Sequence, residues 1–237
     1  MGILLLAQGD PEAKHMLRTA IEVRYGPSPP VLESLRMTFT GRARAKVGPV
    51  KTWVPVDVNT WFQFPNRFRV NFTVRPLGLP VHRAVNAFDS STYREMRSGD
   101  KPVVVDDEAQ VHSVRRRLWA IAALLLTPLG EHFVNLTAEG DTCFKATNTE
   151  LDDAVTVYLS EDKAVDHIEV ECLNPDTGTE QLYRLCLSEE RVAINDLILP
   201  QTISAFWDDE PFYEITPSEA ISNPELEDSL FTLEDFA

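Results

Sequence analysis

The chain has 237 residues, of which 43% are hydrophobic and 25% are charged, values that are ordinary for a soluble globular protein. Its formal net charge is −15, from 37 acidic and 22 basic residues. An acidic chain lacks the basic footprint that nucleic-acid binding requires, and the sequence has no run of roughly 18 apolar residues that could span a bilayer. The composition therefore argues against a nucleic-acid partner and against a transmembrane helix.

The acidic excess is concentrated towards the C-terminus. Lys and Arg are absent after Arg191, whereas the last 46 residues carry eleven acidic groups. We interpret this segment as a solvated acidic edge, with a docking surface for a basic partner as the alternative.

The start of the chain predicts a short segment before a first helix. Residues 1–9 are mostly apolar but have no basic n-region, so we interpret them as a signal-peptide remnant or a disordered start. Asp10 suits an N-cap, Pro11 suits the first helical position, and Gly26 ends the helical pattern. We expect residues 10–237 to form a single domain.

Alternating strands follow this helix. Leu35–Ala45 alternates as one long strand, and Gly41 in its middle suggests a bulge or a bend. Val50–Val56 and Val58–Phe64 are predicted as two separate strand arms. Pro76–Pro80 is an apolar loop that we expect to pack against, or gate, another part of the molecule.

The stretch from Trp61 to Phe72 consists of two strand-like arms around a Pro65-Asn66 corner. Beyond the corner, apolar and polar residues alternate strictly, which is typical of a strand that is buried on one face. Before the corner, aromatic residues fall on both faces. One face can join the core, and the other must meet a second layer, a partner or a ligand.

Asp106–Thr127 is the one long helical pattern in the sequence. Its end, Ala120–Leu126, is apolar all round, and a helix that is apolar on every side is buried on every side. Arg115–Arg117 covers most of one helical turn. We interpret these arginines as a solvated face, with contact to an anionic head group or a partner as the alternative.

The second half of the chain predicts β-structure throughout. Short strand patterns separated by turn signals are typical of a sandwich or a barrel. The candidate strands are Val134–Glu139, Thr142–Ala146, Val155–Ser160, Asp166–Leu173, Glu180–Leu187, Arg191–Leu199, Ile203–Asp208 and Phe212–Thr216, and Asn223–Phe231 follows them as a capping segment.

Motifs with a specific chemistry are missing. HExxH, CxxC, GxSxG, Walker A and GxGxxG do not occur, so we predict no catalytic residue, no metal site and no cofactor. Asp152-Asp153 fits a turn better than a catalytic carboxylate pair. The expected hairpin faces keep Cys172 and Cys186 apart, so all three cysteines are predicted to be free thiols.

Three motifs, taken in order, resemble a known family. They are the aromatic strand with its Pro65-Asn66-x-Phe68 corner, the unit Val85–Tyr93, and Leu199-Pro200 followed by Asn223-Pro224 running into Phe231. Together they resemble the bacterial outer-membrane lipoprotein carrier superfamily (LolA/LolB-like) over residues 12–231. The match departs from the family at Ser90, where glycine is usual in an Asp-Gly turn, and at Phe64, where the carrier has an arginine that helps to hold its lid closed.

The resemblance implies an α+β, mostly β fold. It consists of a curved antiparallel half-open β-barrel with an N-terminal helix and a central helix that acts as lid or plug. It also implies a hydrophobic cavity that shields acyl chains. The lipid-binding candidates are Phe39, Trp53, Trp61, Phe64, Phe68, Val70, Phe72, Leu118, Trp119 and Leu125.

The function expected from this resemblance is that of a periplasmic or otherwise extracytoplasmic lipid or lipoprotein carrier, not an enzyme. Its partners would be acyl chains and membrane-associated donor or acceptor proteins, and we expect a monomer. One alternative is a non-catalytic envelope interaction or sensing domain of the same fold with a filled core. Another is a hydrolase whose carboxylates and histidine converge in a pocket.

Overall fold

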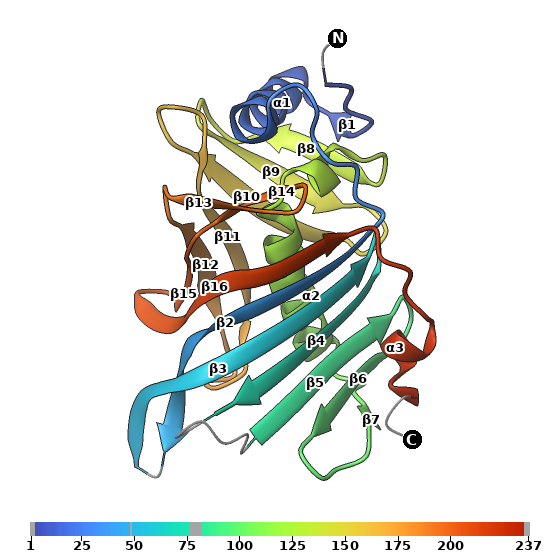
Figure 1. Ribbon diagram of the computed structural model, residues 1–237, viewed down its shortest axis with the longest axis vertical. Helices are drawn as coiled ribbons and strands as arrows, with labels where there is room; N and C mark the ends of the chain where they lie inside the picture. Colours follow the sequence, from blue (N-terminus) through green and yellow to red (C-terminus); the bar gives the residue numbers. More distant parts are fainter. Residues whose placement is uncertain (1–2, 48, 76–81, 235–237) are drawn as a thin grey trace.

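One strongly curved sheet dominates the molecule (Figure 1). The computed structural model describes residues 3–47, 49–75 and 82–234. Within these residues, 14 strands form this sheet and two more form a separate hairpin. The strands are β1 (Gln8–Gly9), β2 (Ser34–Val47), β3 (Val50–Gln63), β4 (Arg67–Val74), β5 (His82–Asp89), β6 (Tyr93–Arg97), β7 (Val103–Val104), β8 (Val134–Ala138), β9 (Cys143–Asn148), β10 (Asp153–Leu159), β11 (Val165–Asn174), β12 (Thr179–Leu187), β13 (Arg191–Ile194), β14 (Leu197–Pro200), β15 (Ile203–Trp207) and β16 (Glu210–Ser222).

The strand order shows how the sheet bends without closing. It runs β1-β8-β9-β10-β11-β12-β15-β16-β2-β3-β4-β5-β6-β7, so β1 and β7 remain at opposite edges. The predicted half-open, mostly β architecture is therefore confirmed. One detail differs, because β1 pairs with β8 in parallel whereas the other pairs in this sheet are antiparallel.

The helices occupy three different places around the sheet (Figure 1). Helix α1 (Pro11–Tyr25) packs on β8 and β9, helix α2 (Glu108–Ala123) packs on β10 and β11 inside the curve, and α3 (Ser229–Thr232) contacts β4 and β5. The 3-10 helix η2 (Thr127–Gly130) follows α2 and contacts both α1 and α2. None of the helices in the described residues has the length and apolarity that crossing a membrane would need.

Helix α2 begins where the sequence predicts and ends earlier. Asp107 caps it by accepting hydrogen bonds from the backbone N–H groups of Ala109 and Gln110. The predicted helix through Thr127 is interrupted at Leu126, whose φ is 67°, and the chain continues as η2. In the apolar end that the sequence marks as buried, Leu124, Leu125 and Leu126 are all 0% exposed, whereas Ile121 is only partly buried.

Three strand predictions need correction. The two arms predicted around Pro55 form the single strand β3, since Pro55 lies just past the last β3–β4 pair, Val56 with Val74, where a missing N–H is tolerated. The strand predicted over Arg191–Leu199 is instead the β13–β14 hairpin, because Asn195 turns the chain with a φ of 55°. Strand β16 extends to Ser222, well past the predicted end.

Gly41 shows why glycine is needed in the middle of β2. A Cβ at this position would lie 2.1 Å from the backbone oxygen of Glu214 in β16. The irregular register lies in β16 itself, between Pro217 and Glu219, rather than in β2. Gly41 therefore permits a close approach between two neighbouring strands.

The C-terminal segment with α3 forms a second layer on the outer face of the sheet, next to the part of β3 whose aromatic residues lie on both faces of the strand. The Arg69 guanidinium lies 5.4 Å from the centre of the Trp61 ring and donates to the carbonyl of Leu230 at 3.0 Å, just before the end of α3. The C-terminal segment thus serves as the cap that the sequence predicts. The predicted apolar loop Pro76–Pro80 lies outside the described residues.

Candidate functional site

An apolar cavity of about 300 Å³ lies between α2 and the concave face of the sheet. The floor comes from β2 to β5, the roof from α2, and one wall from β12 and β16. Every second side chain of each strand points to the concave face, and residues three or four apart on α2 share the helix face that lies opposite. The lining residues are Phe39, Ala43, Arg44, Ala45, Val54, Val58, Thr60, Val70, Phe72, Ala84, Asn86, Val114, Arg117, Leu118, Ile121, Tyr183, Phe212, Tyr213 and Ile215.

Four of the ten residues proposed from the sequence meet at this cavity. Phe39, Val70, Phe72 and Leu118 all line it. The register explains the grouping, because Phe39 pairs with Val58 and Val58 pairs with Phe72 across three adjacent strands. Side chains directly opposite one another on neighbouring strands share a face.

The other six candidates lie elsewhere. Phe64, Phe68 and Trp119 line a much narrower space of about 20 Å³ on another side of α2. Trp53 and Trp61 alternate with cavity residues of β3, so they lie on the outer face, where Trp53 stacks under Arg42 at 4.7 Å. Leu125 is 0% exposed beyond the end of α2.

Sequence reasoning missed the wall that closes the cavity. Tyr183, Phe212, Tyr213 and Ile215 come from β12 and β16, more than 100 residues after β2 in the chain. Alternation within each strand marks their faces, but only the pairing of β16 with β2 brings them beside Phe39. For the roof of the cavity, the sequence does carry a signal, because Val114, Leu118 and Ile121 form one helical stripe and all three line the cavity.

Helix α2 is tied to the β10–β11 side of the cavity by polar contacts. Arg115 donates to the carboxylate of Asp153 at 2.9 Å and 3.3 Å, and to the carbonyl of Leu151 at 2.7 Å. The Asp153 side chain is 0% exposed. Burial raises the pKa of Asp153 above its usual value, although the Arg115 charge opposes this effect. Arg116 donates to the carbonyl of Glu171 at 3.1 Å.

These contacts correct two readings of the sequence. Arg115–Arg117 is not a solvated face, since each of the three side chains is at least half-buried or engaged in contacts within the fold. Asp153 is not a turn residue, because it is the first residue of β10 and its carboxylate is buried.

The Pro-Asn corner ties the two sides of the sheet together at one end of α2. Asn148 donates to the carbonyl of Pro65 at 2.8 Å, and Asn66 donates to the carboxylate of Glu150 at 2.9 Å. Phe64 stacks on Phe62 with ring centres 5.9 Å apart. Amide contacts of the corner therefore join the two sides here.

A polar hollow adjoins the cavity at the other end. We call it the antechamber; its volume is about 450 Å³. It is lined by Ala84, Asn86, Glu95, Met96, Arg97, Gln110, Ser113, Val114, Arg117, Leu173, Pro175 and Gly178. Ala84, Asn86, Val114 and Arg117 line both spaces, so the two are direct neighbours.

Aromatic hydroxyl groups add polarity to the cavity wall beside Arg117. The hydroxyl oxygens of Tyr183 and Tyr213 are 2.6 Å apart and share a hydrogen bond. Burial raises the pKa of Tyr213 to about 12, and the nearby charge of Arg117 opposes this shift. Both tyrosines therefore stay neutral over the physiological pH range.

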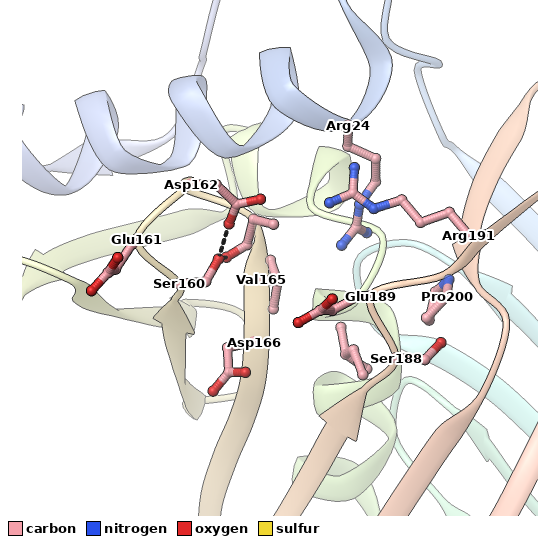
Figure 2. A pocket seen from close by; sticks show the side chains of 12 residues that line it. Arg24, Ser160, Glu161, Asp162, Val165, Asp166, Ser188, Glu189, Arg191 and Pro200 are labelled. Atoms are coloured by element: carbon pink, nitrogen blue, oxygen red, sulfur yellow. Dashed lines mark hydrogen bonds between the residues drawn. The ribbon is translucent and has the colours of Figure 1, made fainter.

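Figure 2 shows a separate hollow of about 410 Å³ beside the end of α1. Arg24 and Arg191 approach each other there, and Glu161, Asp162, Asp166 and Glu189 also line this hollow. Arg24 donates to the carbonyl of Leu124, and burial lowers the pKa of its guanidinium. The charged walls do not suit an apolar ligand, so we assign Arg24 a structural role in joining α1 to the end of α2.

Residues 3–47, 49–75 and 82–234 hold no group of three or more His, Cys, Asp or Glu side chains arranged to bind a metal ion. The three cysteines are free, and Cys172 and Cys186 face Gln181 and His167 in the β11–β12 register. The free cysteines agree with the sequence-based expectation.

Comparison with solved structures identifies the architecture. A LolA superfamily protein from Nitrosomonas europaea matches with a TM-score of 0.52 and 12% identity, over 95% of this chain and 99% of that one. A DUF1329 family protein from Desulfovibrio piger matches with a TM-score of 0.51 and 8% identity, over 93% and 97% of the two chains. The chain has a LolA-like fold.

A proposed outer membrane lipoprotein-sorting protein domain from Vibrio parahaemolyticus matches this LolA-like fold as well. Its TM-score is 0.50 with 8% identity, over 94% of this chain and 98% of that one. No family model matches the sequence, and no curated protein matches it. The likeness therefore rests on the architecture, in agreement with the resemblance of the three sequence motifs.

Proposed function

We propose that this protein is a non-enzymatic carrier that shields an acyl chain in the cavity beneath α2. The observation that carries the proposal is the cavity itself, about 300 Å³ in volume and walled by aliphatic and aromatic side chains on strands and helix alike. Ordinary cores leave few voids larger than a water molecule, whereas small-molecule sites occupy about 300–1,000 Å³. The cavity falls at the lower end of that range, which suits one chain rather than several.

Hydrophobic transfer supplies the energy for such binding. Each buried methylene contributes about 0.8 kcal/mol, so ten methylenes contribute about 8 kcal/mol before the costs of association. A net binding free energy of that size would correspond to a dissociation constant of about 1 μM, and the costs of association weaken the binding from this limit, which favours reversible release of the lipid. No specific polar contact along the chain is needed.

The LolA superfamily and lipoprotein-sorting neighbours support an extracytoplasmic, periplasmic setting and acyl chains of lipids or lipoproteins as cargo. In this proposal the protein acts as a monomer between membrane-associated donor and acceptor proteins. Phe64 and Phe68, which border the narrow space, would pack against Trp119 of α2 and support the roof.

A cavity-filling variant tests the proposal. Ala43 is 4% exposed and lines the cavity, so Ala43→Phe places a ring in the space that the chain would occupy. Ala109→Phe adds the same ring at an exposed position in the first turn of α2 and serves as the control. The neutral probe N-phenyl-1-naphthylamine reports on apolar binding by its fluorescence, and monotetradecanoylglycerol is the competitor.

We expect wild type and Ala109→Phe to bind the competitor alike, and Ala43→Phe to bind it at least about 10-fold more weakly. Equal binding by all three proteins, with unchanged circular dichroism spectra, would place the ligand outside the cavity. A wild-type protein that binds neither probe nor competitor would favour the alternative of an envelope interaction or sensing domain.

A further inference from the structure

Arg117 stands at the junction of the cavity and the antechamber, and its charge is not neutralised there. Its Nε donates to the carbonyl of Ser113 in the same helix at 3.3 Å, and its guanidinium lies 5.6 Å from the centre of the Trp207 ring. Its terminal amino groups donate to no residue in the described part of the chain. No described carboxylate lies within 4.0 Å of it, in contrast to the paired Arg115 on the same helix.

The surroundings of Arg117 are depleted in negative charge, although the whole chain carries −15. Among the described residues, no Asp or Glu lines the cavity. Glu95 is the one carboxylate among the described residues that line the antechamber, and it accepts hydrogen bonds from two neutral groups, the Tyr93 hydroxyl at 2.9 Å and the Gln110 amide at 2.8 Å. Arg97 contributes a second positive charge to the antechamber.

The hollows at the two ends of the cavity give an amphiphile a direction. At the corner end, Asn148 and Asn66 join the two sides of the sheet, and the space beside α2 is only about 20 Å³. At the Arg117 end, the antechamber of about 450 Å³ adjoins the cavity. A bound chain with its tail under α2 would therefore place its polar end beside Arg117.

The geometry points to a single-chain amphiphile with an anionic head, a carboxylate or a phosphate monoester, as the occupant. This assignment rests on the proposed acyl-binding function. The tail fills the cavity, and the head accepts charge-assisted hydrogen bonds from the free terminal amino groups of Arg117, with Arg97 adding long-range attraction. A planar guanidinium binds both carboxylate and phosphate oxygens in a bidentate manner, whereas a neutral head gains little from it.

The test compares heads at a constant tail on the full-length protein. Tetradecanoate and tetradecanoyl lysophosphatidate carry anionic heads, and monotetradecanoylglycerol carries a neutral one. Isothermal titration below each critical micelle concentration gives the dissociation constants. A preference between the two anionic ligands identifies the head group as carboxylate or phosphate.

Three variants separate charge from packing. Arg117→Gln removes the charge and Arg117→Lys retains it, while Arg116→Gln removes a neighbouring arginine of α2 that does not line the cavity or the antechamber. Glu95→Gln removes the negative charge that faces the head group. Circular dichroism and thermal melting establish that each variant is folded.

We expect Arg117→Gln to weaken binding of the anionic amphiphiles about 10- to 100-fold and binding of the glycerol ester less than about 2-fold. Arg117→Lys and Arg116→Gln should retain most of the affinity, and Glu95→Gln should strengthen anion binding. Equal weakening of charged and neutral ligands by Arg117→Gln would make Arg117 a packing residue and overturn the assignment, while the acyl cavity would stand. Failure of every amphiphile to bind wild type would overturn the proposed function as well.

Discussion

The buried ion pair between Arg115 and Asp153 is predicted to hold α2 over the cavity. Arg115 supplies two hydrogen bonds to a carboxylate that is 0% exposed, while the Arg115 side chain is itself 12% exposed. In Arg115→Met, the carboxylate would keep its buried site and lose its main partner. Arg116 stays nearby, but its Nε lies 3.9 Å from the Asp153 carboxylate, beyond hydrogen-bond distance.

Breaking one side of a buried pair costs about 3–5 kcal/mol, because an uncompensated charge is left in the interior. We expect Arg115→Met to lower the free energy of unfolding by that amount at pH 7. The double variant Arg115→Met/Asp153→Leu should be less destabilised than the single variant, because it removes the buried charge as well. Arg42→Met breaks a surface pair with Glu214, whose side chains are 52% and 43% exposed, and should cost less than about 1 kcal/mol.

The pH dependence has a definite sign. Burial already raises the pKa of Asp153, and loss of Arg115 would raise it further in the folded state. When the folded pKa lies above the unfolded one, the folded state retains its proton more strongly, so stability is greatest at low pH and falls as pH rises through the folded pKa. The deficit of Arg115→Met relative to wild type should therefore be larger at pH 7 than at pH 4.5.

Urea unfolding followed by tryptophan fluorescence and circular dichroism measures these differences at both pH values. Lipid-probe affinity, measured in parallel, shows whether a loosened α2 alters the cavity. A loss below 1 kcal/mol for Arg115→Met, or a double variant that is less stable than the single one, would refute the role assigned to this pair.

Three further predictions concern the sheet. Burial opposes ionisation of Asp89, but hydrogen bonds, led by the one from the Thr92 backbone N–H, outweigh this effect and lower the pKa of Asp89 to about 2. The free energy of unfolding of wild type should therefore fall by about 2 kcal/mol as pH falls from about 4 to about 2. Urea titrations of Asp89→Asn should not show this loss. Ser90 has a φ of 84°, so Ser90→Gly should stabilise the protein by about 0.5–1 kcal/mol in the same assay, and a loss of stability would contradict the strain. Gly41→Ala should cost about 3 kcal/mol, because its Cβ would meet the β16 backbone, and a neutral effect would show that the strands can separate.

The sequence predicts the regular parts of this fold because their signals are local. Alternation through Phe68, Val70 and Phe72 identifies β4 and its inner face, and the helical stripe through Leu118 identifies α2. Partners distant in the chain leave no such signal. Arg115 reads as a solvated residue because Asp153, 38 residues later, neutralises it only after folding.

The same reasoning explains which of the sequence candidates line the cavity. Phe39, Val70, Phe72 and Leu118 line it because each is a large apolar residue on the regular inner face of its strand or helix. Trp53 is an aromatic candidate as well, but its position in the β3 alternation puts it on the outer face. The sequence does not distinguish Arg117 from Arg115 and Arg116, because the Trp207 ring and the antechamber lie beside Arg117 only in the folded protein.

Lipid extraction from the purified, native protein, followed by mass spectrometry, tests the central claim most directly. The cavity beneath α2 predicts about one single-chain amphiphile per wild-type and Ala109→Phe molecule, and much less in Ala43→Phe, which fills that space. Wild-type protein that repeatedly carries no more amphiphile than Ala43→Phe would contradict the account.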